Sequence, residues 1–160
     1  VNGEWVSGGE FHKISRANAV YYQNLITLYG KSADGIVPAA QVDFEVPVLT
    51  QLIEDRLIER EAREGLGSDF EALLESRVSE YENDMRLKEA VGKVYGLTFE
   101  DYKREFLVPE ATREILDSQL YLKGEKLEDW LREAKRTGSI RIFSRIFYWD
   151  KEEVRRVGGE

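Results

Sequence analysis

Apolar residues recur at intervals of three and four along most of the chain, which is the spacing of amphipathic helices. The first such stretch follows Ser7, which with Glu10 has the spacing of a capping box, and it ends near Gly30. We therefore expect a long helix here. The apolar and polar positions that share one face of it are Phe11, Ile14, Asn18, Tyr21, Leu25 and Leu28.

The most hydrophobic of the expected helices begins around Pro47. Residues 31–44 lack a sustained period and are expected to form a loop. Pro47 then stands in a first turn, where the missing N–H of proline is tolerated. Because the apolar stripe that follows is the broadest in the chain, we expect this helix at the centre of the fold. The stripe consists of Val48, Leu49, Leu52, Ile53, Leu57, Ile58 and Ala62.

Further helices are expected in the second half of the chain. Ser68 and Glu71 repeat the capping-box spacing, and Thr98 stands before another apolar stretch. Pro109 removes one backbone donor, so it should kink or restart the helix that contains it. The expected helices cover residues 68–87, 87–96, 98–124 and 126–136.

Two short strands are expected at opposite ends of the chain, over residues 4–7 and 140–149. In the second, Arg141, Phe143, Arg145, Phe147 and Trp149 alternate with Ile140, Ile142, Ile146 and Tyr148. A lone strand leaves its backbone groups unpaired, so residues 4–7 are expected to pair with 140–147.

The expected fold class is mostly α, a multi-helix domain with a small two-stranded antiparallel sheet that pairs the N- and C-terminal segments. It forms one domain over residues 1–149, closed by the helix and strand at 126–149. Residues 150–160 are expected to be a charged, frayed tail.

Composition excludes several classes of function. The net charge of −8 argues against nucleic-acid binding, which needs a basic surface. The absence of cysteine removes disulfides and thiolate chemistry, and no apolar run is long enough to span a membrane. The chain opens at Val1 rather than methionine, which agrees with the removal of an upstream signal or anchor.

No catalytic set can be assembled from the sequence. His12 is the single histidine, and a partly exposed position on the first helix is favoured over a titrating switch. The clustered glutamates lack the spacing of a calcium loop and have arginines nearby, so a solvated helix surface is favoured. No glycine-rich phosphate loop precedes a helix. We expect neither enzymatic activity nor a metal or cofactor.

Four segments, taken in order, resemble the N-terminal chaperone domain of the SurA-type family, which includes the PrsA-like foldases. They are Val-Asn-Gly-Glu at 1–4, Val-Leu-Thr-Gln-Leu-Ile-Glu-Asp-Arg-Leu-Ile at 48–58, Tyr-Gly-Leu-Thr-Phe-Glu-Asp-Tyr at 95–102, and Leu-Glu-Asp-Trp-Leu at 127–131 leading into Ile-Arg-Ile at 140–142. The similarity extends over residues 1 to about 147. It implies a helical chaperone domain outside the cytoplasm, in the periplasm of a bacterium or anchored to its membrane.

The chain departs from the family pattern in one place. Most relatives carry a parvulin-type prolyl isomerase domain between the long helix and the closing helix. Here residues 121–126 join the two helices directly, and a domain of roughly 100 residues has no room. The resemblance therefore implies ATP-independent binding of unfolded or nascent exported polypeptides, without isomerase activity.

Aromatic side chains supply the candidate client-binding residues. One set lies on the first helix, and the other on the closing strand, where a role in the core is the competing interpretation. The second hypothesis is a structural or assembly protein that docks a dedicated partner, or itself as a homodimer by strand or helix exchange, through the closing strand. The candidates are Tyr21, Tyr22, Leu25, Tyr29, Phe143, Phe147 and Trp149.

Overall fold

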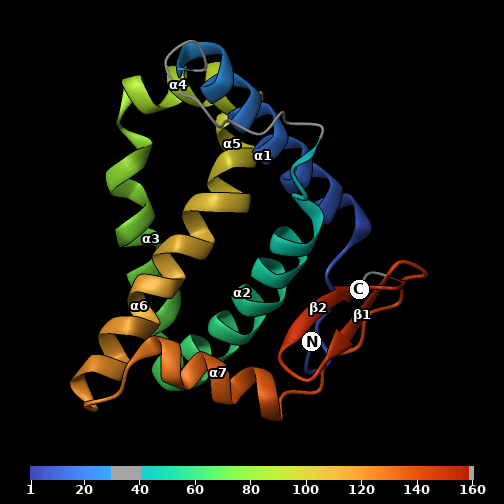
Figure 1. Ribbon diagram of the computed structural model, residues 1–160. Coiled ribbons are helices and arrows are strands. Elements are labelled where there is room, and N and C mark those ends of the chain that lie inside the picture. Colours follow the sequence, from blue (N-terminus) through green and yellow to red (C-terminus); the bar gives the residue numbers. More distant parts are fainter. Residues whose placement is uncertain (30–40, 159–160) are drawn as a thin grey trace.

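Helices dominate the computed structural model, which describes residues 1–29 and 41–158, except for the side chain of Tyr29 (Figure 1). A small antiparallel sheet of two strands stands at one side of the helical body. The expected class, mostly α with a small two-stranded sheet, is confirmed. The elements are α1 Gly8–Tyr29, α2 Glu45–Leu66, α3 Asp69–Glu82, α4 Met85–Tyr95, α5 Phe99–Tyr102, the π-helix Lys103–Leu107, α6 Val108–Leu122, α7 Leu127–Thr137, β1 Phe147–Asp150 and β2 Glu153–Arg156.

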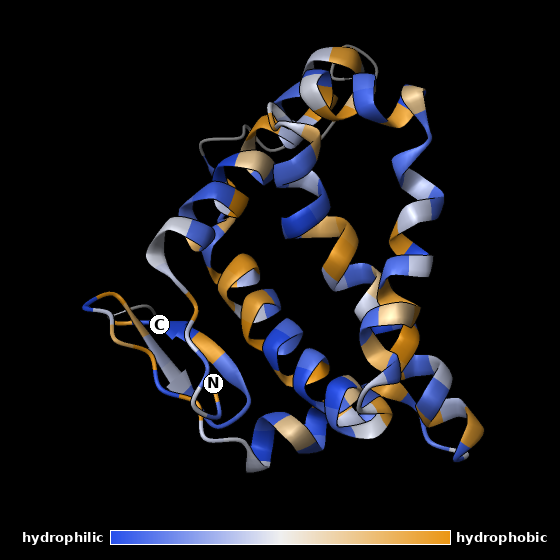
Figure 2. Cartoon of the chain, turned by 180° about the vertical axis from the view of Figure 1, so that it is seen from behind, coloured by the Kyte–Doolittle hydropathy of each residue, from blue (hydrophilic) through white to orange (hydrophobic). Residues whose placement is uncertain are grey.

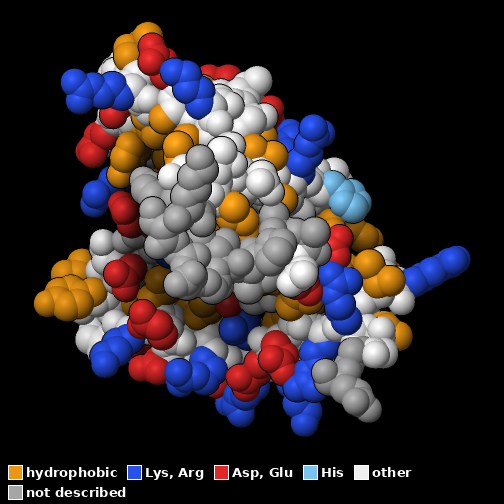
Figure 3. Space-filling model, turned by 45° about the horizontal axis from the view of Figure 1, so that its top comes forward, with side chains coloured by type: hydrophobic (Ala, Val, Ile, Leu, Met, Phe, Trp, Pro, Cys, Tyr) orange, Lys and Arg blue, Asp and Glu red, His pale blue; other side chains and the backbone are white. Residues whose placement is uncertain are grey.

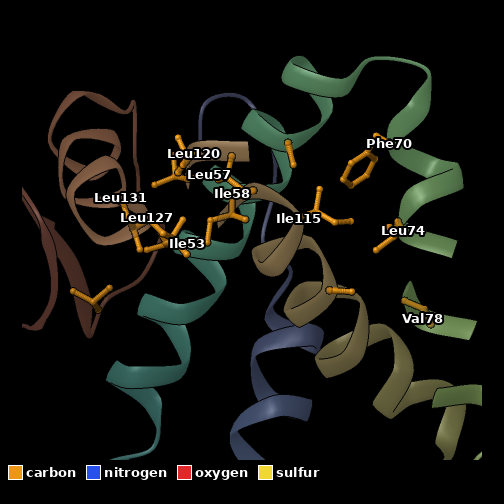
Figure 4. Close-up of a cluster of buried hydrophobic side chains, with 14 of the residues drawn as sticks. Ile53, Leu57, Ile58, Phe70, Leu74, Val78, Ile115, Leu120, Leu127 and Leu131 are labelled. Atoms are coloured by element: carbon orange, nitrogen blue, oxygen red, sulfur yellow. The ribbon is translucent and has the colours of Figure 1, made fainter. Parts of the chain in front are cut away.

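Helix α2 lies at the centre, as its apolar stripe predicts. It contacts α1, α3, α6, α7 and β2, and hydrophobic and hydrophilic residues alternate along it (Figure 2). In the core, Ile53, Leu57 and Ile58 of α2 lie near leucines of α6 and α7, while Ile115 points toward the side chains of α3 (Figure 4). Each such side chain contributes roughly 1.5–3 kcal/mol when it leaves water, so the stripe decides which helix is innermost.

The caps follow the sequence only in part. The Ser7 hydroxyl accepts a hydrogen bond from the Glu10 N–H at 3.0 Å, as expected. Ser68 makes no capping bond. The two helices expected over 68–87 and 87–96 are both present, but the boundary at residue 87 is wrong: α3 ends at Glu82, and Asp84 caps α4 by accepting from the N–H groups of Arg86 and Leu87. An aspartate that satisfies two free donors favours a new helix start over continuation of the old one.

Pro109 does not break its helix. The chain is helical from Phe99 to Leu122, and the turn before Pro109 widens into the π-helix Lys103–Leu107, in which the Val108 N–H donates to the Lys103 carbonyl. Proline has no N–H for the carbonyl four residues earlier, that of Glu105, and its ring crowds that oxygen. The wider turn accommodates the ring, so the expected kink or restart becomes a π-bulge.

The sheet is a local hairpin, and the expected pairing of residues 4–7 with 140–147 is wrong. β1 pairs antiparallel with β2, with Phe147 opposite Arg156 and Asp150 opposite Glu153. The expected frayed tail over 150–160 is wrong as well, because it contains β2 and the buried Val154. A two-residue turn closes this hairpin at a far smaller loss of chain entropy than pairing the two ends of the chain would require.

The N-terminal segment is nevertheless tied to the chain that follows α7. The Asn2 N–H donates to the Ser139 carbonyl at 2.9 Å, and the Asn2 side-chain oxygen accepts from the Ser139 N–H at 2.7 Å. Asn2 has φ of 49°, in the left-handed region that asparagine tolerates better than most residues. These bonds hold the N-terminal segment beside residues 139–146 and the hairpin (Figure 1).

We expect Asn2→Ala to loosen this segment, because it removes the side-chain bond and puts a less tolerant residue at a positive φ. The two effects together should destabilise the local structure by roughly 1–2 kcal/mol. Hydrogen exchange of residues 3–7 measures the loosening directly. Asn2→Gly serves as the comparison, since it removes the bond but relieves the backbone, and it should loosen the segment less. Equal exchange rates in both variants would show that the positive φ of residue 2 contributes nothing to the loosening of residues 3–7.

Candidate functional site

An open groove of about 640 Å³ lies between the N-terminal segment and the chain that follows α7. One wall is formed by residues 3–8, the other by residues 139–147, and α1 and α2 supply the floor. We call it the terminal groove. Its apolar lining comes from Val1, Val6, Phe11, Leu49, Ile53, Ile142, Ile146 and Phe147, and the rim carries Trp5 and Phe143.

Trp5 and Phe143 form an exposed aromatic pair at the rim. Their ring centroids are 5.6 Å apart and the rings are stacked at 23°, yet Trp5 is 76% and Phe143 78% exposed. Each wall of the terminal groove contributes one ring. An aromatic side chain can bury about 150–250 Å², so this pair leaves much of its apolar area in contact with solvent. Contiguous exposed apolar area next to a hollow is typical of contact sites.

Few charged groups border the terminal groove. Glu4, His12 and Arg141 line it, and the His12 ring lies 5.2 Å from that of Phe11. His12 is exposed, as expected of a helix surface. No ion pair is formed by Arg141 or by its neighbour Arg145 within the residues that the structure describes. The result is a mainly apolar hollow that is lined by one carboxylate, Glu4, and one guanidinium, Arg141, with a second free guanidinium, Arg145, on the same segment of chain.

The closing-strand candidates separate into different environments. Phe143 stands at the rim, Phe147 is only 4% exposed and belongs to the core, and Trp149 is half-buried against the core. The sequence placed all three on one face. The alternation changes at Ser144, whose hydroxyl accepts from the N–H groups of Ile146 and Phe147. The bend over 145–146 turns Phe147 inward, and a strict period of two cannot anticipate such a bend.

The candidates on α1 lie outside the terminal groove. Tyr21 stacks on Tyr95 of α4, with centroids 4.9 Å apart, and Tyr22 meets the edge of Phe44 at 5.6 Å. Leu25 is half-buried, and the side chain of Tyr29 lies outside the described residues. The structure thus places Tyr21 in the contact between α1 and α4, and it does not join the two candidate sets into one surface.

Several residues of the terminal groove were not among the candidates from the sequence, notably Trp5, Phe11 and Ile142. Trp5 could have been recognised as a site residue from the sequence. A short segment before a capped helix offers few residues that could bury a tryptophan. Phe11 and the α2 residues Leu49 and Ile53 carried no such signal. Their spacing is that of ordinary core positions: Ile53 is buried beneath the hollow, and only the placement of the two walls leaves Phe11 and Leu49 half-buried at its floor.

A second hollow, of about 600 Å³, lies between α1, α2 and the π-helix and is lined by charged side chains. Lys13 pairs with Asp101 at 2.8 Å, and Arg56 pairs with Glu10 at 2.6 Å. Asp55 is buried, 3.4 Å from Arg113, and burial raises its pKa to about 6. Charges that satisfy one another in this way join the helices, and we assign the hollow a structural role.

Other surfaces of the molecule also expose apolar side chains among charged ones (Figure 3). The most exposed are Tyr121 and Leu122 at the end of α6, at 79% and 85%. Neither residue lines the terminal groove or the charged hollow between α1, α2 and the π-helix. Within the described ranges, no cluster of histidine, aspartate and glutamate suits a metal ion, and no helix is both long and apolar enough to cross a membrane.

Comparison with known proteins returns no relative. No family model matches the chain, and neither a curated protein nor a solved structure matches it. The molecule is therefore defined by its own features: a helical domain with an open, mainly apolar groove between its two terminal segments.

Proposed function

We propose that this protein is an ATP-independent chaperone domain that holds unfolded or nascent exported polypeptides in the terminal groove. One observation carries the proposal: a stacked pair of aromatic rings, Trp5 and Phe143, stays exposed at the rim of an apolar hollow. A protein that kept these rings only for its own stability would bury them, because burial is what makes them stabilising.

Unfolded chains expose apolar and aromatic side chains in no fixed order. A groove that recognises apolar area holds them weakly and without strict sequence preference. The surrounding charge, −8 over the chain, keeps such a complex soluble. Release then follows from mass action, and no nucleotide is needed.

The resemblance of four segments to the SurA-type N-terminal domain supports the same proposal. It adds the location, outside the cytoplasm, where exported proteins arrive unfolded. It also adds the expectation that the protein does not accelerate prolyl isomerisation, because only residues 123–126 connect α6 to α7 and no domain intervenes.

The test is suppression of aggregation of a chemically denatured client, followed by light scattering without ATP. We expect the wild type to slow aggregation at several-fold excess, and Trp5→Ala/Phe143→Ala to lose most of this effect. Loss of two large apolar contacts should weaken binding about tenfold or more. A prolyl isomerisation assay on the same samples should show no acceleration.

The matched control is Tyr121→Ala/Leu122→Ala, which removes an equally exposed apolar pair at the far end of α6. It should retain the wild-type effect. If both double variants lose activity equally, recognition is a property of any apolar surface and not of the terminal groove. If the wild type itself leaves aggregation unchanged at every ratio, the chaperone proposal is wrong.

A second candidate function is docking of a dedicated partner, or of a second copy, through the C-terminal hairpin. The observation in its favour is that β1 and β2 pair only with each other within the described chain, so each has an outer edge free to take a further strand. Light scattering after size-exclusion chromatography decides on self-association. A variant that tests this interface should leave Phe147 in place, because its ring belongs to the core.

A further inference from the structure

We infer that the terminal groove takes an extended polypeptide strand with alternating apolar and acidic side chains, whose backbone pairs with residues 140–143. This inference rests on the proposed function and specifies its substrate. It follows from three features of one wall: the alternation of its side chains, the free backbone groups that it presents, and the two free cations beside it.

Burial alternates along residues 140–143. Ile140 and Ile142 are half-buried against the core, whereas Arg141 and Phe143 are exposed. A period of two is the signature of extended backbone. Yet this stretch belongs to neither strand, because β1 begins only at Phe147.

The backbone of this wall has hydrogen-bonding capacity to spare. Within the described residues, no hydrogen bond is made by the backbone N–H or C=O groups of Arg141, Ile142 and Phe143. On the opposite wall the backbone of Trp5 and Val6 is equally free. The two segments that were expected to pair with each other therefore line the terminal groove without pairing. An extended segment with a free edge is suited to accept an added strand.

An added strand would use both the free backbone groups of residues 140–143 and the apolar hollow beside them. Its main-chain groups would bond to residues 140–143, which gives affinity for any sequence. Alternate side chains would point into the hollow above Phe11, Leu49 and Ile53 and carry the preference for apolar residues. The remaining side chains would face outward, toward the arginines.

The unpaired arginines determine which side chains the ligand should carry on its outward face. Most arginines of the protein are ion-paired, as Arg56 is with Glu10 and Arg156 with Asp43 and Glu45. Arg141 and Arg145 are exposed and have no such partner in the described part of the chain. Arg141 lines the terminal groove, and Arg145 lies two residues beyond Phe143 in sequence, between the lining residues Ser144 and Ile146. In a protein of net charge −8, two free arginines at this place favour a ligand with carboxylates.

The experiment uses the full chain and dye-labelled peptides of about ten residues, read by fluorescence anisotropy. The parent alternates phenylalanine or isoleucine with aspartate, and a second peptide replaces each aspartate with lysine. We expect the lysine peptide to bind about fivefold more weakly at low salt, with the difference shrinking as salt rises. Arg141→Glu/Arg145→Glu should reverse the preference. Arg86→Glu, at an exposed arginine of α4, should leave it unchanged.

Two further peptides carry N-methyl groups on alternate residues, one in each register. A strand offers alternate N–H groups to each of its edges, so one register should lose about tenfold in affinity and the other should bind nearly as the parent does. Hydrogen exchange should show protection of the amides of Arg141, Ile142 and Phe143 when the parent peptide is bound.

The outcomes separate this inference from the proposed function. Equal affinity in both methylated registers, or no charge preference, overturns the strand inference while binding itself stands. Suppression of client aggregation without binding of any peptide overturns the inference alone. Failure of both peptide binding and aggregation suppression overturns the inference and the proposed function together.

Discussion

Phe147→Ala is expected to destabilise the protein by about 3–5 kcal/mol, whereas Phe143→Ala should change its stability by no more than about 0.5 kcal/mol. The two phenylalanines lie four residues apart, and the sequence pattern assigns them to the same face. Their exposed fractions, 4% and 78%, are nearly opposite extremes.

The difference follows from what each ring touches. Phe147 packs edge-on against Phe11, with centroids 6.0 Å apart, and the Arg156 guanidinium lies 4.9 Å above its ring. It also belongs to the core cluster that includes Ile53 and Val154. Truncation would open a cavity between the hairpin and α2, which adds to the lost transfer energy. Phe143 meets only Trp5 among the aromatic rings of the described chain.

Urea unfolding followed by circular dichroism measures both changes on the same scale. Phe143→Ala is the matched control, because it makes the same chemical change on the same segment. Similar losses in the two variants would mean that Phe143 is buried in solution, and the terminal groove would then be closed. A loss below 1 kcal/mol for Phe147→Ala would mean that the hairpin does not pack on α2.

The free energy of unfolding is expected to fall as pH rises from about 4 to above 6 because Asp55 ionises. Asp55→Asn should remove the part of the fall that Asp55 causes. Asp55 stands on α2 with 7% exposure. Burial raises its pKa from 3.8 to about 6, an effect that the Arg113 guanidinium at 3.4 Å offsets only in part. Desolvation of a charged carboxylate therefore outweighs the attraction of its partner.

The sign follows from proton binding. A folded-state pKa above that of the unfolded chain means that the folded protein holds the proton more tightly, so protonated Asp55 is compatible with the fold and ionisation opposes it. A shift from 3.8 to about 6 corresponds to roughly 3 kcal/mol. This penalty is absent below about pH 4, develops between the two pKa values, and is complete above the folded-state value.

Asp55→Asn mimics the neutral carboxyl. We expect the variant to match the wild type near pH 4 and to be more stable at pH 8 by as much as 1–3 kcal/mol, on the order of the shift. Urea midpoints between pH 4 and 8 give the measurement, and Asp117→Asn on the exposed side of α6 is the control. A variant less stable than the wild type at pH 8 would show that the bond to Arg113 outweighs the desolvation of Asp55.

Local chemistry in the sequence determined most of the helical architecture. The apolar stripe after Pro47 predicted α2 and its central place, because a helix with a broad apolar face must be surrounded by others. Ser7 predicted the start of α1 through a cap that needs only neighbouring residues. These features depend on residues that are close in sequence and not on which helices pack together. The sequence therefore reveals them without knowledge of the tertiary structure.

The partnership of distant segments could be decided only by the tertiary structure. Residues 4–7 and 140–147 have the composition of strands that could pair, but the hairpin of β1 with β2 forms at a smaller entropy loss and buries Phe147 against α2. The bend after Ser144 then leaves Phe143 outside. The terminal groove exists because the two segments lie side by side unpaired, and its opening depends on packing that no local pattern records.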